Sequence, residues 1–237
     1  MISTHPHTTS YYAASVNHHT SFALLDGNVN ADVCVIGAGF TGISTALHLA
    51  ERGYNVHVVE ANKVGWGASG RNGGQMIGGI SGDSKMASSL GAEGERVLWD
   101  MGWAGHDIIR QRVKNYNINC DLKTGYLDVA IKPRHIRDLE VYYERLQKYQ
   151  FPHHFQMLTK SETQNALGTD AYIGALRNDG NGHIHPLNLC IGEAQAAVGL
   201  GATIYEHSPV VEIKRGKKAT VLTENGSVTA ECVVLAG

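Results

Sequence analysis

The most restrictive feature of this 237-residue sequence is a glycine-rich turn that joins an apolar strand to a helix. Residues 32–36 are nearly all apolar and rich in β-branched side chains, which is typical of a parallel strand buried on both faces. Residues 43–50 carry apolar side chains at helical spacing. Between the two patterns lie three glycines, Gly37, Gly39 and Gly42. This order predicts the start of a βαβ unit.

The glycine spacing is the one that dinucleotide-binding turns require. Gly37 would form the tight turn, Gly39 would let the backbone approach a pyrophosphate, and Gly42 would let helix and strand pack closely. A second predicted strand, 56–59, ends in Glu60, a carboxylate placed to accept hydrogen bonds from ribose hydroxyls. The helix N-terminus offers free N–H groups to the phosphates. The predicted binding residues here are Gly37, Gly39, Phe40, Thr41, Gly42, Glu60 and Ala61. The fingerprint alone leaves FAD, NAD and a turn that binds nothing as alternatives.

A second glycine-rich segment, residues 63–82, follows Glu60 and contains Trp66, Arg71 and Met76. Loops of this length inside a domain are usually functional or disordered. The order of both glycine segments, with Gly67–Gln75 in the second, resembles the D-amino-acid-oxidase-like FAD-dependent oxidoreductases. Within them, three motifs resemble the gamma-glutamylputrescine oxidase family: Ser10–Ser15, Gly67–Gln75 and Gly182–Leu189. The resemblance runs from about Ser10 to Gly237 and covers about the N-terminal half of the family's length.

The resemblance implies FAD as cofactor and a small-molecule amine as substrate. Members of the family oxidise the terminal amine of gamma-glutamylputrescine to an imine, which water converts to an aldehyde and ammonia in putrescine catabolism. Oxygen then reoxidises the flavin and gives hydrogen peroxide. The resemblance also implies further FAD contacts, with Val211 contacting the adenine through its backbone: Ser69, Arg71, Asn72, Gly73, Gly74, Gln75, Val211 and Gly237. The alternatives are a surface ion pair for Arg71 and a plain core position for Val211.

No catalytic residue is assigned from the sequence. His183 and His185 have the right pKa range for a base that accepts a proton from the amine. Their segment lies where the superfamily has a turn leading into a helix, so a structural role is the alternative.

We expect an α/β fold, with a discontinuous Rossmann-like FAD-binding domain and part of an α+β substrate domain. The predicted parts are a polar, loosely ordered arm at 1–29, FAD-binding segments at 30–115 and 187–237, and the partial substrate domain at 116–186. Within that last part, Asn178–Gly182 reads as a turn. Further on, Asn225-Gly226 predicts a hairpin, followed by a separate buried strand from residue 232.

Composition excludes several other classes. With 20 basic and 22 acidic residues and no long run of one sign, a nucleic-acid partner is not expected. No stretch approaches about 18 apolar residues, so we expect no membrane span. The histidines near the start fit a polar arm better than a metal site. The four cysteines, Cys34, Cys120, Cys190 and Cys232, form no C-x-x-C pair. They indicate reduced, mostly buried thiols in a cytoplasmic protein. Cys34 and Cys232 lie in apolar runs that predict core strands.

Three alternatives for function remain open. Another amine or amino-acid oxidase, for glycine, sarcosine or D-amino acids, shares the same cofactor. The abrupt end at Gly237, inside a predicted strand, favours an FAD-binding fragment without turnover of its own. An NAD-dependent dehydrogenase fits the first glycine turn but not the loop containing Arg71 to Gly74.

Overall fold

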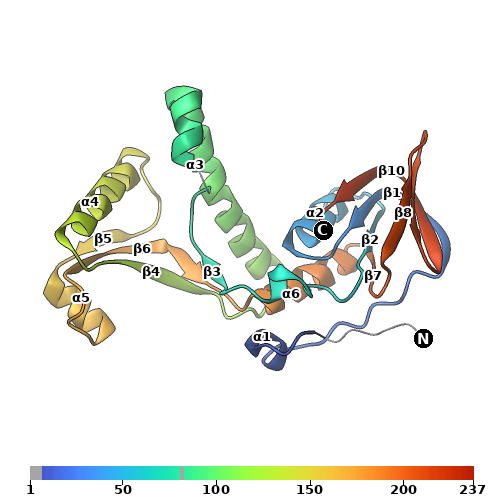
Figure 1. The fold of residues 1–237 in the computed structure, drawn as a ribbon, viewed down its shortest axis with the longest axis horizontal. Coiled ribbons are helices and arrows are strands. Elements are labelled where there is room, and N and C mark those ends of the chain that lie inside the picture. The colour runs from blue at the N-terminus through green and yellow to red at the C-terminus, as the bar shows by residue number, and fades with distance from the viewer. Residues whose placement is uncertain (1–6, 81–82) are drawn as a thin grey trace. The chain divides into compact units, whose positions relative to one another are not determined.

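The computed structural model describes residues 7–80 and 83–237 and divides into two compact units (Figure 1). The first unit comprises Met1–Gly74, Arg110–Cys120 and His185–Gly237. The second comprises Gln75–Ile109 and Asp121–Ile184. Among the described residues, no helix combines the length and apolar character needed to cross a bilayer.

A six-stranded sheet forms the centre of the first unit. Its strand order is β7-β2-β1-β10-β9-β8, in which the first four strands are parallel and the last two pair antiparallel. The parallel strands are β1 (Gly27–Ile36), β2 (Val56–Val59), β7 (Thr203–Tyr205) and β10 (Gly226–Leu235), and the antiparallel ones are β8 (Val210–Lys214) and β9 (Ala219–Thr223). Because β1 and β2 are joined by a helix and lie side by side in parallel, the expected βαβ unit is confirmed.

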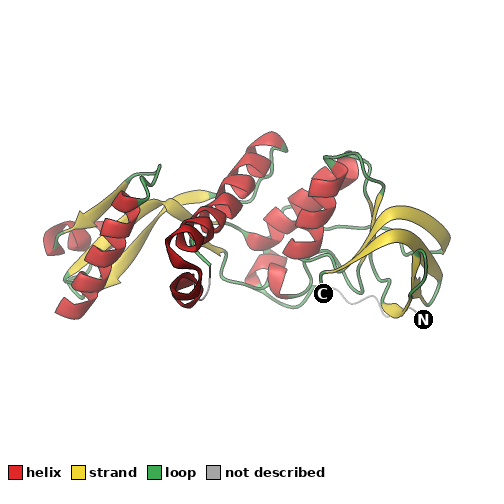
Figure 2. Ribbon diagram, turned by 90° about the horizontal axis from the view of Figure 1, so that it is seen from above, coloured by secondary structure: helices red, strands yellow, loops and turns green. Residues whose placement is uncertain are grey.

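Both faces of this sheet are buried at β2 and at the carboxyl end of β1. The first face carries Val33 and Val35 of β1 and packs against α2 (Phe40–Ala50) and α6 (Pro186–Gly199). Figure 2 shows these helices in red beside the yellow strands. On the opposite face, Cys34 of β1 lies in a second buried cluster with Leu25 of the N-terminal arm, Val221 of β9 and Val228 of β10. Double burial explains why β1 reads as a continuous apolar run rather than as an alternating one.

A glycine in the left-handed region follows the end of α2. After Ala50 the chain passes through Gly53, whose φ of 80° lies in the left-handed region that glycine adopts without strain. The Gly53 N–H donates to Ala50 O at 2.9 Å, and the chain then enters β2.

The second unit is an antiparallel sheet with three helices and an aromatic core. Its sheet has the order β3-β6-β4, and β5 pairs with β6. Trp99, Trp103 and Phe151 pack with Leu146 and Leu176 in one buried cluster. The elements are β3 (Gln75–Met76), β4 (Lys123–Ala130), β5 (Phe155–Leu158), β6 (Gly174–His183), α4 (Pro133–Lys148), α5 (Lys160–Leu167) and α3 (Asp83–Asn115), which enters the first unit at Arg110.

Two element predictions in the sequence analysis are wrong. Asn178–Gly182 is not a turn, because β6 continues through it to His183 and pairs with β4. Its glycines serve close packing: a methyl at Gly180 would overlap Phe151, and one at Gly182 would overlap Lys123 O. The expected break before residue 232 is also absent, since β10 runs unbroken from Gly226 to Leu235 along β1.

The observed units also differ from the expected segment boundaries. Residues 75–109 lie in the second unit, whereas the sequence pattern groups them with the first FAD-binding segment. The physical reason is that Trp99 and Trp103 of α3 pack on Leu176 of β6.

The N-terminal arm is ordered where it is described. It contains the short helix α1 (Tyr11–Ala14), and Leu25 is fully buried. The Asn17 N–H donates to Asn188 Oδ1 at 2.9 Å, which ties the arm to α6. The expectation of a loosely ordered arm is therefore wrong for residues 7–29. His5 lies outside the described residues.

Cysteine burial leads to a testable prediction. Cys34, Cys120 and Cys190 are buried, and burial raises the pKa of the Cys34 thiol to about 12. Cys232 is exposed, which corrects the expectation that it lies in the core. Because the thiolate is the reacting form, iodoacetamide should modify Cys232 and leave the other three intact until the protein is denatured. Peptide mass mapping measures this; comparable native labelling of Cys34 would contradict the packing described.

Candidate dinucleotide-binding site

The glycine turn after β1 is built by close backbone packing. Gly37 has φ 102°, and a methyl there would lie 2.8 Å from Ala236 O. A methyl on Gly42 would overlap Gly37 O. The first turn of α2 therefore rests directly on the end of β1, which requires glycine at both positions.

The start of α2 is capped from the second glycine-rich segment. Its N-cap residue, Gly39, has no side chain to offer, and the Phe40 N–H donates instead to Ser69 Oγ at 2.9 Å. A methyl at Gly39 would lie 2.9 Å from that same oxygen. The structure thus brings together Gly39, Phe40 and Ser69. The other first-turn N–H groups of a helix have no intrahelical partner and carry partial positive charge, which suits an anion such as a phosphate.

Glu60 lies half-buried at the carboxyl end of β2 and faces the same turn. Its Oε2 accepts the Ala38 N–H at 2.8 Å, and its Oε1 accepts the Asn62 N–H at 2.8 Å. An ionised carboxylate offers about four acceptor sites, so two backbone bonds fix its position and leave capacity for hydroxyl donors.

The loop from Gly65 to Gly74 is compact rather than extended. The Gly65 N–H donates to Ala38 O at 2.9 Å, which attaches the loop to the glycine turn. The loop contains the short 3₁₀ helix η1 (Ala68–Gly70). Asn72 then closes it, since its Nδ2 donates to Ser69 O at 3.1 Å and its Oδ1 accepts the Gly74 N–H at 2.8 Å.

The Arg71 side chain is exposed, and its guanidinium lies over the ring of Trp66. Its guanidinium lies 4.8 Å from the centroid of the Trp66 ring, and its Nε donates to Gly67 O at 3.2 Å. No ion pair joins Arg71 to another described residue. A cation–π contact of this kind leaves the remaining guanidinium N–H groups available to an anion.

The other predicted site residues lie in different places. Gly237 follows Ala236, whose N–H donates to Ile36 O at 2.9 Å, so Gly237 lies beside Gly37. Ala61 and Gly73 are exposed in the loops after Glu60 and η1. Gln75 begins β3 and belongs to the second unit.

Val211 is not a core residue. It is 61% exposed and lies where the β8–β9 register passes from Val210 directly to Glu212. A bulge of this kind leaves backbone groups unpaired. β8 also starts close to β2, because the Ser208 N–H donates to Glu60 O at 2.8 Å.

His185 has a structural role. It is the N-cap of α6, where its Nδ1 accepts the Asn188 N–H at 3.1 Å. Its Nε2 therefore carries the proton and lies 3.2 Å from Ser15 Oγ. Both ring nitrogens are engaged in the buried side chain, which argues against a catalytic base at His185. His183 is exposed near the end of β6 and pairs with Gln75 across the sheet.

A buried carboxylate at Glu206 was not predicted from the sequence, although a signal existed. Glu206 directly follows β7, just as Glu60 directly follows β2, and β7 and β2 are parallel neighbours. An acid after a short buried strand could have been flagged in both places. Glu206 is fully buried and hydrogen-bonds the backbone of the loop after Glu60.

The first unit is a Rossmann-type dinucleotide-binding domain. It combines parallel strands with a glycine turn packed against them, a helix N-terminus next to that turn, and a carboxylate at the end of the neighbouring strand. The particular family is given by a protein-family model described as DAO, FAD dependent oxidoreductase, which matches residues 32–237. The chain belongs to this family, and its cofactor is FAD. The NAD alternative is thereby removed. The residues present fit the cofactor, since the turn that a Cβ would fill and the donors beside it suit a pyrophosphate.

Curated relatives agree with this family. The chain is 44% identical over 232 residues to gamma-glutamylputrescine oxidoreductase of Escherichia coli, covering 98% of this chain and 54% of that protein. It is 41% identical to a probable oxidoreductase, OrdL, of Haemophilus influenzae, covering 97% of this chain and 54% of the relative. The chain therefore spans about half the length of the curated relatives it matches.

Solved structures share the fold. Glycine oxidase from Geobacillus kaustophilus matches with a TM-score of 0.68 at 24% identity, over 88% of this chain and 55% of that one. L-Amino acid deaminase from Proteus myxofaciens matches with a TM-score of 0.75 at 24% identity, over 94% and 48% of the two chains. These likenesses support the FAD-oxidase fold.

The contact between Gly42 and Gly37 can be tested by substitution. Gly42→Ala should lower the free energy of unfolding by at least about 2 kcal/mol, because the new methyl overlaps a backbone carbonyl that cannot move freely. Urea denaturation followed by circular dichroism measures this. Gly199→Ala, at the end of α6, is the control: its methyl meets no described atom within 4 Å, so the change should stay within about 0.5 kcal/mol. Equal stability of the two variants would refute the close packing.

Proposed function

We propose that the first unit binds the adenosine and pyrophosphate of FAD where the two glycine-rich segments meet. The observation that supports this is the joint construction of the helix start, in which Ser69 caps α2 while Glu60 is held by Ala38 and Asn62. The proposed contact residues of the first unit are Gly37, Gly39, Phe40, Thr41, Gly42, Glu60, Ala61, Ser69, Arg71, Asn72, Gly73, Gly74, Val211 and Gly237. Gln75, which the family resemblance also implies, belongs to the second unit.

Each group in this site would have a definite task. The N-terminus of α2 would attract the pyrophosphate, and the Ser69 hydroxyl, which accepts from Phe40, can still donate its own hydrogen to a phosphate oxygen. Glu60 would accept from ribose hydroxyls, and its charge would repel a 2′-phosphate. The backbone groups left free at the Val211 bulge would hydrogen-bond the adenine.

For the whole protein, we propose the oxidation of a primary amine, with gamma-glutamylputrescine as substrate. The single observation behind this choice is the 44% identity to the Escherichia coli relative of that name. When bound, FAD would supply the acceptor for a hydride, which carries the electron pair away from the amine carbon, and the amine nitrogen would release a proton. The resulting imine reacts with water to give an aldehyde and ammonia, and we propose oxygen as the final acceptor, which becomes hydrogen peroxide. We also propose a cytoplasmic location, which the four free thiols support.

A second candidate is the oxidation of an amino acid. It is favoured by a curated relative named glycine oxidase, from Geobacillus kaustophilus, which is 29% identical over 86% of this chain. This lower identity places it behind the amine.

The proposed reaction is tested by the absorbance spectrum of the full-length protein. We expect flavin bands that bleach when gamma-glutamylputrescine is added without oxygen and return when air is admitted. Bands that stay oxidised with this amine but bleach with glycine would transfer the assignment to the second candidate. A protein with no flavin bands, even after incubation with FAD, would contradict the cofactor site itself.

The phosphate position is tested by Gly39→Val. A side chain there should remove bound FAD, because it fills the space in front of the α2 N-terminus. Gly67→Val is the control, since a methyl at Gly67 in the neighbouring loop meets no described atom within 4 Å. The flavin-to-protein ratio after purification is the measurement. A normal ratio in Gly39→Val would remove the fingerprint from the proposed site.

A further inference from the structure

Glu206 is a fully buried carboxylate that joins two segments of the first unit, the N-terminal arm and the loop after Glu60, to the end of β7. It lies directly after β7, and its Oε1 accepts the Val64 N–H at 2.9 Å. Its Oε2 accepts the Phe22 N–H at 3.2 Å, and the Thr20 hydroxyl donates to Oε1. A carboxylate without water around it needs such donors, because burying an unpaired charge costs several kcal/mol.

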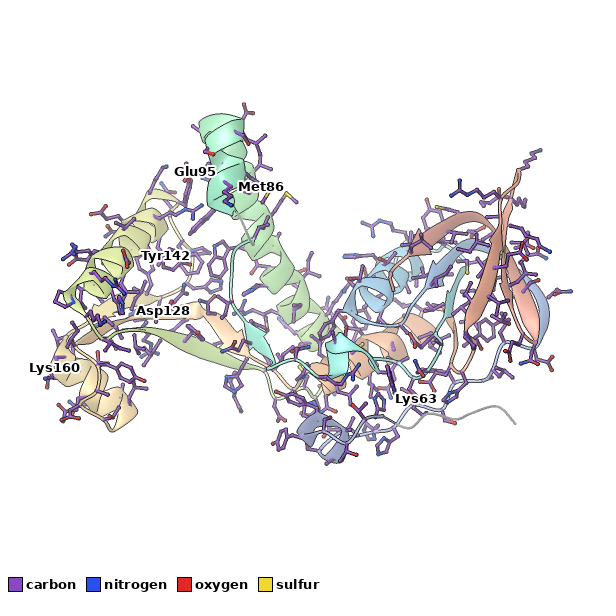
Figure 3. The ribbon with its side chains drawn as sticks, in the orientation of Figure 1. Lys63, Met86, Glu95, Asp128, Tyr142 and Lys160 are labelled. Atoms are coloured by element: carbon purple, nitrogen blue, oxygen red, sulfur yellow. The ribbon has the colours of Figure 1, made fainter. Side chains whose placement is uncertain are left out.

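Lys63, labelled in Figure 3, supplies the matching charge. Its Nζ lies 3.3 Å from Glu206 Oε2 and donates to Thr20 O at 2.7 Å. The Lys63 side chain is 21% exposed, so the pair is largely shielded from solvent. The ion pair and the backbone bonds therefore fix the chain at residues 63–64 from one side.

The same segment is attached on its other side to the candidate cofactor site. The main chain from Glu60 to Val64 is short, and Glu60 at its start is the carboxylate proposed to hold the ribose. The His207 N–H donates to Asn62 O at 2.8 Å, and the Ser208 N–H donates to Glu60 O at 2.8 Å. Gly65, at the end, donates to Ala38 O in the glycine turn. Movement at Val64 would thus be passed to both Glu60 and the glycine turn.

We propose that Glu206, paired with Lys63, is a positioning residue for FAD, and this inference rests on the proposed cofactor site. Glu206 does not itself touch the cofactor. It holds residues 60–65 in the one path that aims Glu60 at the ribose and keeps Gly65 against Ala38. Because Thr20 and Phe22 bind the same carboxylate, the N-terminal arm is part of this support.

The test compares FAD affinity and apoprotein stability in matched variants of the full-length protein. Glu206→Gln keeps the shape but leaves the Lys63 ammonium without its counter-ion. We expect the Kd for FAD, measured by quenching of flavin fluorescence, to rise at least tenfold. The double variant Glu206→Gln, Lys63→Met removes both charges, so no ammonium is left without its counter-ion, but the amide nitrogen still faces a backbone or hydroxyl donor. We expect its FAD Kd to lie between that of Glu206→Gln and that of the parent.

A matched control exists in the same unit. Glu193 of α6 is buried and pairs with Arg112 at 2.9 Å, and Arg112 also donates to Ser44 Oγ of α2. Among the residues that the structure describes, this pair forms no hydrogen bond or ion pair with residues 60–65, so Glu193→Gln should lower the Tm of the apoprotein yet change the FAD Kd less than twofold. The two buried carboxylates thus separate loss of stability from loss of cofactor positioning.

The outcomes are distinct. If Glu206→Gln lowers the apoprotein Tm as Glu193→Gln does and leaves the FAD Kd unchanged, Glu206 is only structural and the inference is wrong. Should Glu206→Gln fail to fold, Thr20→Val removes just the arm's side-chain bond. Its FAD Kd should rise about threefold, and an unchanged value would overturn the inference. A parent protein that binds no FAD would instead refute the proposed cofactor site on which the inference rests.

Discussion

The close approach of α2 to the end of β1 is the constraint on which the rest of the first unit depends. Because a Cβ at Gly42 would overlap Gly37 O, the helix can start directly above the strand only with glycine there. That start brings Phe40 to Ser69 and sets Ala38 opposite both Glu60 and Gly65. The proposed phosphate site therefore depends on packing, because packing holds the N-terminus of α2 close to the carboxyl end of β1.

Much of this arrangement could be predicted from the sequence, because its signals are local. β1, α2, β2 and Glu60 follow from the apolar periodicity and glycine spacing of residues 32–60. The error at Asn178–Gly182 has the opposite cause. Five residues typical of turns form part of β6 because β4 pairs with Asn178 and Gly182 and Phe151 packs against Gly180, and both partners are distant in the sequence. Local propensity was overridden by tertiary contacts.

The candidate site shows the same division. The sequence indicated which residues to include in the candidate site, but not the contacts between them. These contacts are Ser69 as the cap of α2, Trp66 beside the Arg71 guanidinium, and Ala38 as a donor to Glu60. Glu206 lies 186 positions from its partner Thr20, and no spacing rule connects residues so far apart. The arm shows this most clearly, since its polar composition is typical of disorder while its order comes from a carboxylate near the other end of the chain.

Because Ser69 caps α2, the hydrogen bond of the first helical amide depends on the position of the loop that contains Ser69. A helix normally carries its own N-cap one residue before its first turn, so its ends open and close independently of distant segments. Here the Phe40 amide is protected by an oxygen that is 29 positions later in the chain. Each time the loop from Gly65 to Gly74 opens locally, that amide becomes free to exchange with solvent deuterium. The exchange rate of a single backbone hydrogen would therefore report how often this loop opens.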